Sequence, residues 1–328
     1  MTMTITIPLA LDPKQKTGKN IIFLYFCRIQ KQSAEIMPKK RILFIVNPIS
    51  GHRDKSRFRE KVACVLDDGD FVYEVVFTER AGHAVDLAES AVGNYDIVAA
   101  VGGDGTLNEV ACGLVGTDTT LAVIPCGSGN GLARCLHIPL NTDKALRILT
   151  QGHIQRIDTG TVNGQLFLSV AGIGLDAQTA HDFAQDPRRG FLTYAHYAVS
   201  NYLHPKLETV NITFDEKETL TCSPMLITFA NSNQFGYHAV IAPHASLQDG
   251  LLNVCILNRP PLVTIPDVVT KLMDGRIDKS RYLTEIQAAH ITVERPAAGV
   301  VNIDGEPVMM DAELDVRVVP QNIRVVVP

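Results

Sequence analysis

The sequence predicts an α/β protein in which a doubly wound parallel-sheet domain is followed by an antiparallel, β-sandwich-like domain. In the first half, short apolar runs alternate with stretches of helical periodicity, which is the order expected of a parallel sheet. In the second half, strand-like runs follow one another with turn signals and few helices between them, which indicates antiparallel pairing. A length of 328 residues also favours two domains over one.

The elements of the first half alternate strictly between strand and helix. Apolar runs that end in Gly, Pro or Asn predict buried parallel strands, and apolar residues at helical spacing predict the helices between them. Phe58, Val62 and Leu66 form one such helical stripe. We predict strands at 41–46, 71–77, 96–101 and 121–124, and helices at 55–66, 84–92, 107–115 and 131–137.

The second half consists mainly of predicted strands. Asn163-Gly164 separates two apolar runs and predicts a hairpin turn. Helical spacing recurs only at 192–203 and 262–274. We predict strands at 157–162, 166–171, 210–214, 225–230, 252–257, 291–294, 300–303, 314–319 and 323–327.

These patterns divide the chain into three parts. Residues 39–153 are expected to form the α/β domain, and residues 154–328 the β-rich domain. Residues 1–38 carry no clear periodicity, and Met37-Pro38 stands directly before the first strand. We therefore expect residues 1–38 to be a disordered extension or the product of a misassigned start, an added edge strand or helix being the alternative.

Composition excludes several classes of protein. The formal net charge is −5 and no long basic block occurs, which argues against a nucleic-acid partner. The seven cysteines are odd in number and show no C-x-x-C spacing, so a disulfide framework or a zinc site is disfavoured and a reducing cytoplasm is expected. No run reaches the roughly 18–20 apolar residues of a membrane-spanning helix.

The densest chemical signal is the segment Gly102-Gly103-Asp104-Gly105-Thr106. It follows a predicted strand and precedes a predicted helix. Glycines let phosphate oxygens approach backbone N–H groups, and the helix presents its positive end to them. Asp104 places a carboxylate beside that anion, which requires a cation or a transferred proton between them. A tight turn capped by Asp104 is the alternative interpretation.

Other strand ends carry similar residues. Asn47-Pro48-Ile49-Ser50-Gly51 follows the first strand, Thr78 the second, and Pro125-Cys126-Gly127-Ser128-Gly129-Asn130 the fourth. Loops at the carboxyl ends of parallel strands meet at one edge of the sheet. Four such loops suit a nucleoside triphosphate held by backbone and hydroxyl donors. Neither the P-loop pattern nor the dinucleotide-binding fingerprint is present.

Together these motifs resemble the signatures of the diacylglycerol kinase catalytic domain family, which includes bacterial lipid kinases and sphingosine and ceramide kinases. The resemblance extends over residues 39–328 and depends on the order and spacing of three motifs. It implies a kinase that transfers the γ-phosphoryl group of ATP to a hydroxyl of diacylglycerol, a sphingoid base or a similar membrane lipid. The implied nucleotide-binding positions are Asn47, Pro48, Ser50, Gly51, Thr78, Gly102, Gly103, Asp104, Gly105, Thr106, Leu107, Asn108, Gly127, Ser128 and Asn130.

The resemblance also implies functional residues in the second half. Asp304-Gly305-Glu306 is similar to the family element that supplies the general base. We favour Glu306 as the proton acceptor and Asp304 as a partner of Mg²⁺ or of the acceptor hydroxyl, with Asp104 in a catalytic or metal-binding role, although the sequence leaves the choice between Asp304 and Glu306 open. A plain hairpin turn at Asp304-Gly305 is the alternative.

A second turn resembles the cation-binding turn of the family. There Asp249 would offer a carboxylate, and Ser246 and Leu251 backbone carbonyls, which are hard oxygen ligands suited to Mg²⁺ or Ca²⁺. One departure concerns the pair Asn130-Gly131, where many bacterial members carry Asn-Asp. The missing carboxylate puts the usual metal network in doubt and shifts the expected acceptor toward a sphingoid base or another single-hydroxyl lipid.

Two other functions remain open at this stage. One is an NAD kinase-like phosphotransferase, and the other is a non-catalytic nucleotide- or lipid-binding regulator. For a lipid kinase we expect ATP and Mg²⁺ as cofactors, transient peripheral contact with a membrane, and a cytoplasmic location. The sequence identifies neither the lipid nor the oligomeric state, a homodimer included.

Overall fold

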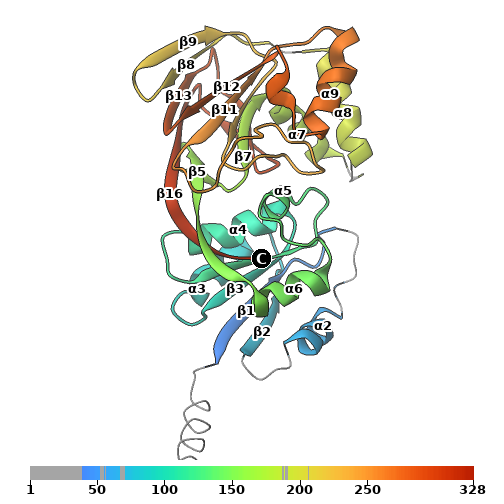
Figure 1. Ribbon diagram of the computed structural model, residues 1–328, viewed down its shortest axis with the longest axis vertical. Coiled ribbons are helices and arrows are strands. Elements are labelled where there is room, and N and C mark those ends of the chain that lie inside the picture. The colour runs from blue at the N-terminus through green and yellow to red at the C-terminus, as the bar shows by residue number, and fades with distance from the viewer. Residues whose placement is uncertain are drawn as a thin grey trace, which may run out of the picture. The chain divides into compact units, whose positions relative to one another are not determined.

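The computed structural model describes residues 39–51, 55, 57–66, 71–186, 188, 191–205 and 207–328. The predicted extension, residues 1–38, lies outside the described residues. Residues Lys40–Pro328 form one compact unit. Figure 1 shows this unit as a parallel sheet with helices, followed along the chain by a β-rich part with antiparallel strands.

The first part is a parallel sheet with the strand order β2-β1-β3-β4. Its α3 and α4 pack against each other, as do α2 and α6, and Figure 1 shows the two pairs on opposite sides of the sheet. All six residues of β3 and of β4 are buried, because helices cover both faces. The elements are β1 Lys40–Val46, α2 Phe58–Val65, β2 Phe71–Phe77, α3 His83–Ala91, β3 Ile97–Gly102, α4 Asp104–Leu114, β4 Thr120–Pro125, α5 Gly131–Cys135 and α6 Thr142–Gln151.

The β-rich part contains a six-stranded antiparallel sheet with the order β12-β11-β10-β7-β14-β15. A second layer, β16-β13-β8-β9, packs against it, since Ile212 and Val293 of one layer share a core with Phe229 and Val254 of the other. The strands are β5 His153–Val162, β6 Gln165–Phe167, β7 Val170–Gly174, β8 Val210–Phe214, β9 Glu218–Cys222, β10 Leu226–Ala230, β11 Leu252–Leu257, β12 Leu283–Ala288, β13 His290–Glu294, β14 Gly299–Ile303, β15 Glu306–Met310 and β16 Glu313–Val327.

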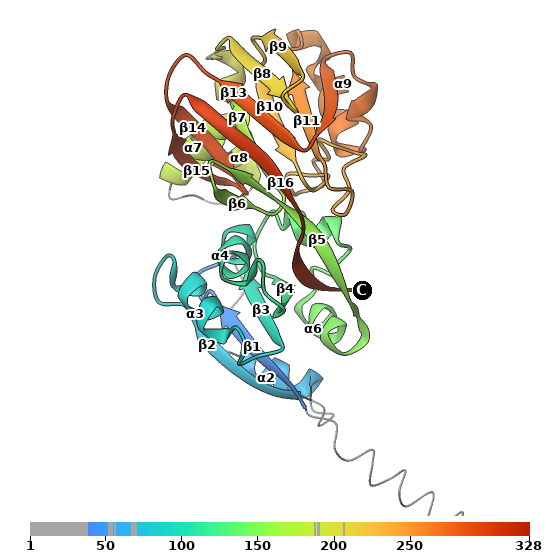
Figure 2. The same ribbon diagram turned by 90° about the vertical axis from the view of Figure 1, so that its left-hand side faces the viewer.

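The last strand, β16, is shared by both parts. Its C-terminal end lies parallel to β4, with Val325 opposite Leu121, and so extends the N-terminal sheet. It also pairs antiparallel with β5 along most of its length, with an irregularity between Val319 and Ile323. Figure 2 shows β5 and β16 running side by side from one part to the other. These two strands therefore join the parts through backbone hydrogen bonds.

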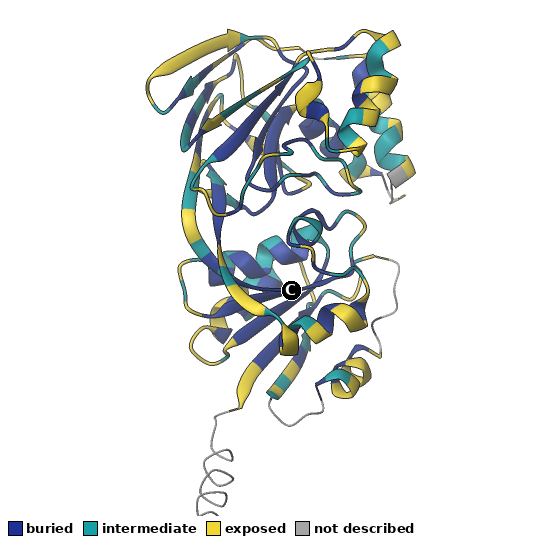
Figure 3. Cartoon of the chain, in the orientation of Figure 1, coloured by how far each residue is buried: buried dark blue, intermediate teal, exposed yellow. Residues whose placement is uncertain are grey.

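Helices accompany the β-rich part on one side. They are α7 Leu175–Gln185, α8 Phe191–Leu203, η1 Leu262–Thr264, α9 Ile265–Met273 and η2 Ile277–Lys279. The first two pack against each other. Exposed positions recur along α8 and α9 (Figure 3). In the part of the chain that the structure describes, no helix is long and apolar enough to cross a membrane.

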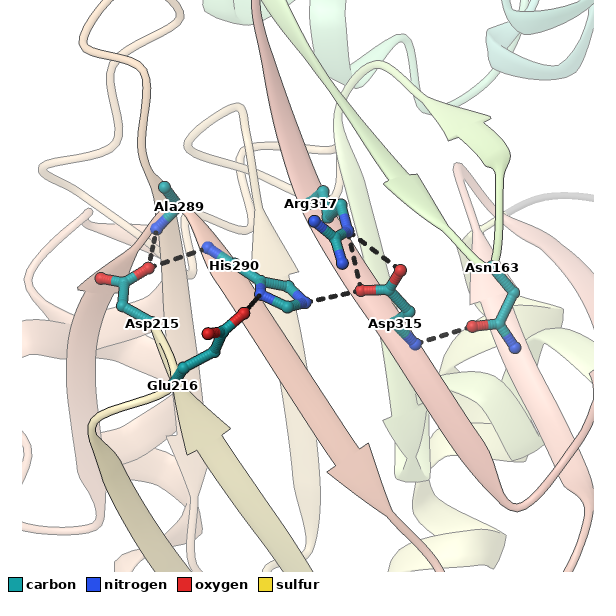
Figure 4. A network of polar contacts seen from close by, with 7 residues as sticks. All are labelled: Asn163, Asp215, Glu216, Ala289, His290, Asp315 and Arg317. Atoms are coloured by element: carbon teal, nitrogen blue, oxygen red, sulfur yellow. Dashed lines mark hydrogen bonds and ion pairs between the residues drawn. The ribbon is translucent and has the colours of Figure 1, made fainter.

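A polar network fixes the outer layer of the β-rich part (Figure 4). Asp215, in the turn between β8 and β9, accepts hydrogen bonds from the backbone N–H groups of Ala289 and His290, each at 3.0 Å. The imidazole of His290 lies between Glu216, at 3.6 Å, and Asp315, at 2.7 Å. The network thus ties the β8–β9 turn to β13 and β16.

Candidate active site

Three of the predicted glycine-rich loops meet where the sequence places them, at the carboxyl ends of β1, β3 and β4. Backbone hydrogen bonds join neighbouring strand ends, from the Asn47 N–H to the Val101 carbonyl and from the Cys126 N–H to the Gly102 carbonyl. Gly51 has φ of +65°, and a Cβ there would lie 1.9 Å from the carbonyl oxygen of Cys126. Only glycine allows such an approach.

Side chains also join the loops. The Asn47 amide donates to the Thr106 hydroxyl at 2.9 Å, so the loop after β1 is tied to the start of α4. The Asn47 side chain also accepts a bond from the Ile49 N–H at 3.1 Å. The Ser50 hydroxyl donates to the Asn47 carbonyl at 3.2 Å. These contacts hold the hydroxyls of Ser50 and Thr106 in one group of polar residues.

Asp104 connects the loop after β3 to the loop after β4. Its carboxylate accepts bonds from the backbone N–H groups of Asn130, at 2.8 Å, and Gly131, at 2.9 Å, where α5 begins. Burial and the nearby charge of Asp304 raise the pKa of Asp104 to about 6, although the two N–H bonds oppose the rise. The ionised form of a carboxyl group with a raised pKa would be stabilised by a nearby cation. The site therefore fits a divalent metal beside Asp104.

Asp304 lies in the hairpin turn between β14 and β15, and Glu306 is the first residue of β15. Asp304 and Gly305 have φ of +48° and +93°, as a two-residue type I′ turn requires. The alternative interpretation as a hairpin turn is thus correct as local structure. It does not compete with a role in the site, because the same turn brings both carboxylates beside α4.

The two carboxylates have different surroundings. Asp304 is 8% exposed and accepts bonds from the N–H groups of residues 168–170, at 2.7 to 3.1 Å, and from the Asn108 amide, at 2.9 Å. Burial raises its pKa despite these bonds. Glu306 is exposed, and its Oε1 would lie 3.2 Å from a Cβ placed on Gly105. Asp304 therefore anchors the turn, whereas Glu306 extends over the glycine-rich loop.

The remaining predicted nucleotide-binding residues differ in exposure. Pro48 and Ser128 are exposed, and Asn130 is buried with φ of +52°. Leu107 packs its side chain into the core of the first part. The N–H of Thr78 is bonded to the carbonyl of Val46, which holds Thr78 at the end of β2 beside the loop that follows β1.

The predicted cation turn, residues 246–251, lies before β11. The Ser246 hydroxyl accepts a bond from the Gln248 N–H, and Asp249 accepts one from the Leu251 N–H at 3.1 Å. Buried Asp158 accepts a bond from the Gly250 N–H at 2.8 Å and thereby holds the turn. Asp249 is exposed, and its carboxylate and the carbonyls of Ser246 and Leu251 are hard oxygen ligands, so the turn fits a hydrated Mg²⁺. No cluster of three or more His, Cys, Asp or Glu suited to a metal occurs among the described residues.

Two further residues have surroundings that the sequence does not reveal. By sequence Arg134 is a lone cation on a helix, either a phosphate contact or a surface charge, whereas in the structure its Nε donates to the Gly129 carbonyl at 3.0 Å and its Nη1 contacts His238 at 2.7 Å. Asp176 is 5% exposed at the start of α7, and burial raises its pKa to about 7. One partner of each lies more than one hundred positions away in the sequence, His238 for Arg134 and Asn302 for Asp176, so no local pattern marks these contacts.

Comparisons with known proteins identify the family of the chain. Residues 41–162 match the family model "Diacylglycerol kinase catalytic domain", and residues 169–327 match "YegS C-terminal NAD kinase beta sandwich-like domain". A diacylglycerol kinase of Bacillus subtilis is 31% identical over 81% of this chain and 90% of its own. One of Staphylococcus saprophyticus is 28% identical over 82% and 89%.

Solved structures share the fold. A crystal structure from Bacillus anthracis has a TM-score of 0.75 at 24% identity and covers 89% of this chain and 99% of its own. A diacylglycerol kinase of the same organism has a TM-score of 0.70 at 20% identity, over 89% and 98%. The kinase family implies ATP and a lipid as substrates. The chain therefore belongs to the bacterial diacylglycerol kinase-like family, and it is a lipid kinase.

Proposed function

We propose that this protein transfers the γ-phosphoryl group of ATP to a hydroxyl of diacylglycerol, a sphingoid base or a similar membrane lipid. The observation that carries the proposal is the position of Glu306, whose carboxylate extends over Gly105 in the loop expected to bind the phosphates. Relatives named diacylglycerol kinase support the first of these acceptors. Gly131, in place of a carboxylate beside Asn130, favours the second.

The residues suggest separate roles for the glycine-rich loops and for the carboxylates. Backbone N–H groups of the glycine-rich loops and the hydroxyls of Ser50 and Thr106 would bind the phosphates, and Glu306 would accept the proton of the attacking hydroxyl. Asp304 would orient Glu306 through the turn that both share. Mg²⁺, held by Asp104 and by phosphate oxygens, would neutralise charge on the transferring group.

A pocket in the β-rich part is the proposed site for the lipid chain. It has a volume of about 530 Å³ and lies between α7 and the strands β7, β10 and β14, with Ile173, Leu175, Met225, Val300 and Met309 among its lining residues. Three of its lining residues, Gly299, Val300 and Met309, belong to the hairpin that carries Asp304 and Glu306. A lipid bound there would therefore lie on the same hairpin as the proposed base.

We also propose that the protein contacts the membrane peripherally from the cytoplasm. The end of α8 adjoins the start of η1, since the Tyr202 carbonyl accepts a bond from Arg259 at 3.1 Å. Large apolar side chains are exposed along both elements and α9. Such a surface suits transient contact with a bilayer. The side chains are Leu192, Val199, Leu203, Leu262, Val263 and Val269.

The acceptor can be identified with a panel of lipids. Purified protein would receive ATP labelled at the γ-phosphate, Mg²⁺ and mixed micelles of diacylglycerol, sphingosine, ceramide or undecaprenol, and mass spectrometry would identify the product. Glu306→Gln should reduce turnover roughly 10²–10⁴-fold. Glu218→Gln, at an exposed position on β9, serves as the matched control. Normal turnover by Glu306→Gln would remove that residue as the base.

Membrane contact needs a separate test. The double variant Leu262→Glu, Val263→Glu should reduce co-sedimentation with vesicles that contain the accepted lipid. Val72→Glu, at an exposed apolar position on β2, is the control. Turnover of a short-chain, water-soluble acceptor should be unchanged in the double variant. Equal binding of both variants to vesicles would refute the proposed surface. Sedimentation analysis of the same samples without vesicles would show whether the protein is a homodimer.

A further inference from the structure

Lys55 is a buried lysine that the proposed mechanism does not use. Its exposed fraction is only 5%, and it lies between the loop after β1 and α2. Lysine is rarely buried this completely unless its charge is paired, because removing an ammonium group from water is costly. The position therefore calls for a physical explanation.

The described contacts of the Lys55 ammonium group are to neutral oxygens. It donates to the backbone carbonyl of Ser50 and, at 2.8 Å, to the Ser50 hydroxyl. Within the ranges that the structure describes, no carboxylate lies within ion-pair distance of it. Burial lowers the pKa of Lys55, and the nearby Cys126 thiol opposes this effect only in part. The ammonium group thus lacks a described counter-charge.

Lys55 lies where two of the glycine-rich loops meet. Ser50, which holds the ammonium group, also donates to the carbonyl of Asn47, and Gly51 packs directly against Cys126. A triphosphate bound by these loops would bring several negative charges to this place. Asp104, Asp304 and Glu306 lie beside the loops after β3 and β4 and would repel that charge unless cations offset it.

We propose that Lys55 is a phosphate-binding residue of the nucleotide site. Ser50 positions the ammonium group of Lys55 for contact with an anion. The inference rests on the proposed function in assigning the nucleotide to these loops. It adds a cationic side chain to a site otherwise built from backbone and hydroxyl donors. The ligand class is a nucleoside di- or triphosphate, and Lys55 contributes to binding through the phosphates and not through the base or ribose.

Three variants test this role. Lys55→Met removes the charge and keeps the chain length, Lys55→Arg keeps the charge, and Lys61→Met is a matched control on α2, where Lys61 is exposed and 3.9 Å from Asp143. A hydrogen bond to a charged group contributes about 1.5–3 kcal/mol, so Lys55→Met should raise the Kd of ADP and the KM of ATP roughly tenfold to a hundredfold. The KM of the lipid and the binding of adenosine should change less than about twofold.

The pattern of results separates binding from support of the loop. If Lys55 only supports the loop, Lys55→Met should lower the melting temperature of the unliganded protein and weaken adenosine and ADP equally. That outcome would refute the proposal, as would an unchanged KM of ATP. Lys55→Arg should recover most of the ADP affinity, whereas failure to do so would count against a charge effect.

The same experiment distinguishes this inference from the proposed acceptor. ADP binding is measured by the rise in melting temperature and needs no lipid. If no lipid of the panel is phosphorylated but Lys55→Met still loses the response to ADP, the role of Lys55 stands and the proposed acceptors are wrong. If ADP and ATP leave the melting temperature of the unsubstituted protein unchanged, the inference is refuted.

Discussion

Replacing Asp104 by asparagine should stabilise the protein while it abolishes turnover. The pKa of Asp104 is raised from 3.8 to about 6, a difference of about two units, and each unit corresponds to about 1.4 kcal/mol. Removing the charge should therefore recover up to about 3 kcal/mol at neutral pH. The neutral amide can accept only one of the two N–H bonds from Asn130 and Gly131, which costs about 1 kcal/mol. We expect a net gain of about 2 kcal/mol.

The pH dependence gives the direction of this effect. Because the pKa of Asp104 is higher in the folded than in the unfolded state, the folded state binds the proton more readily. The contribution of Asp104 to the stability of the unsubstituted protein should thus fall as pH rises from about 4 to about 6 and then stay level. The advantage of Asp104→Asn should be full above pH 6 and largely absent at pH 4.5.

Urea unfolding of the nucleotide-free protein at pH 7.5 and pH 4.5 would measure both quantities. Glu313→Gln, at an exposed position at the start of β16, is the matched control and should change the free energy of unfolding by less than about 0.5 kcal/mol. An Asp104→Asn variant less stable than the unsubstituted protein at pH 7.5 would refute the expected gain. An equal gain at the two pH values would refute its assignment to the charge of Asp104.

Three further predictions concern the loops and turns. Asp304→Ala should lower the free energy of unfolding by about 3 kcal/mol or more, because the buried N–H groups of residues 168–170 lose their acceptor. Thermal melting measures this loss, and an unchanged melting temperature would contradict it. Gly51→Ala should abolish the rise in melting temperature with ADP, because its Cβ would displace Cys126 and with it the next loop; a normal response would show that the loops can move apart. Asp249→Ala should abolish the rise in melting temperature that Mg²⁺ causes. Identical melting curves of the unsubstituted protein with and without Mg²⁺ would exclude the cation turn.

The fold was largely predictable where periodicity is local. The strands before Asn47 and Gly102 are short apolar runs with clear ends, and the alternation with helices indicates parallel pairing. The strands predicted at 314–319 and 323–327 are one strand, β16, because Pro320-Gln321-Asn322 forms an irregularity and not a turn. Helix α7 was missed because polar residues break its apolar stripe.

The candidate site was predictable to a different extent in its two halves. Glycine-rich loops are recognisable because each follows its own strand, so the loops that carry Gly51, Gly103 and Gly127 could be placed at one edge of the sheet from sequence. The role of Asp304 as an anchor could not be, since its backbone donors lie more than 130 residues earlier in the chain. Lys55 was equally invisible, because burial of a single lysine depends on how the loops pack and leaves no periodic pattern.

The pairing of β16 with β4 constrains the order of events during synthesis. The sheet that carries the glycine-rich loops lacks its fifth strand until the ribosome has added the C-terminal part of β16, which includes Val325. Until then β4 presents an unpaired edge, which is a template for pairing with other chains. A nascent chain, or one terminated before β16, should therefore depend on protection of that edge. Loss of the C-terminal part of β16 should affect the nucleotide-binding half as severely as the β-rich half.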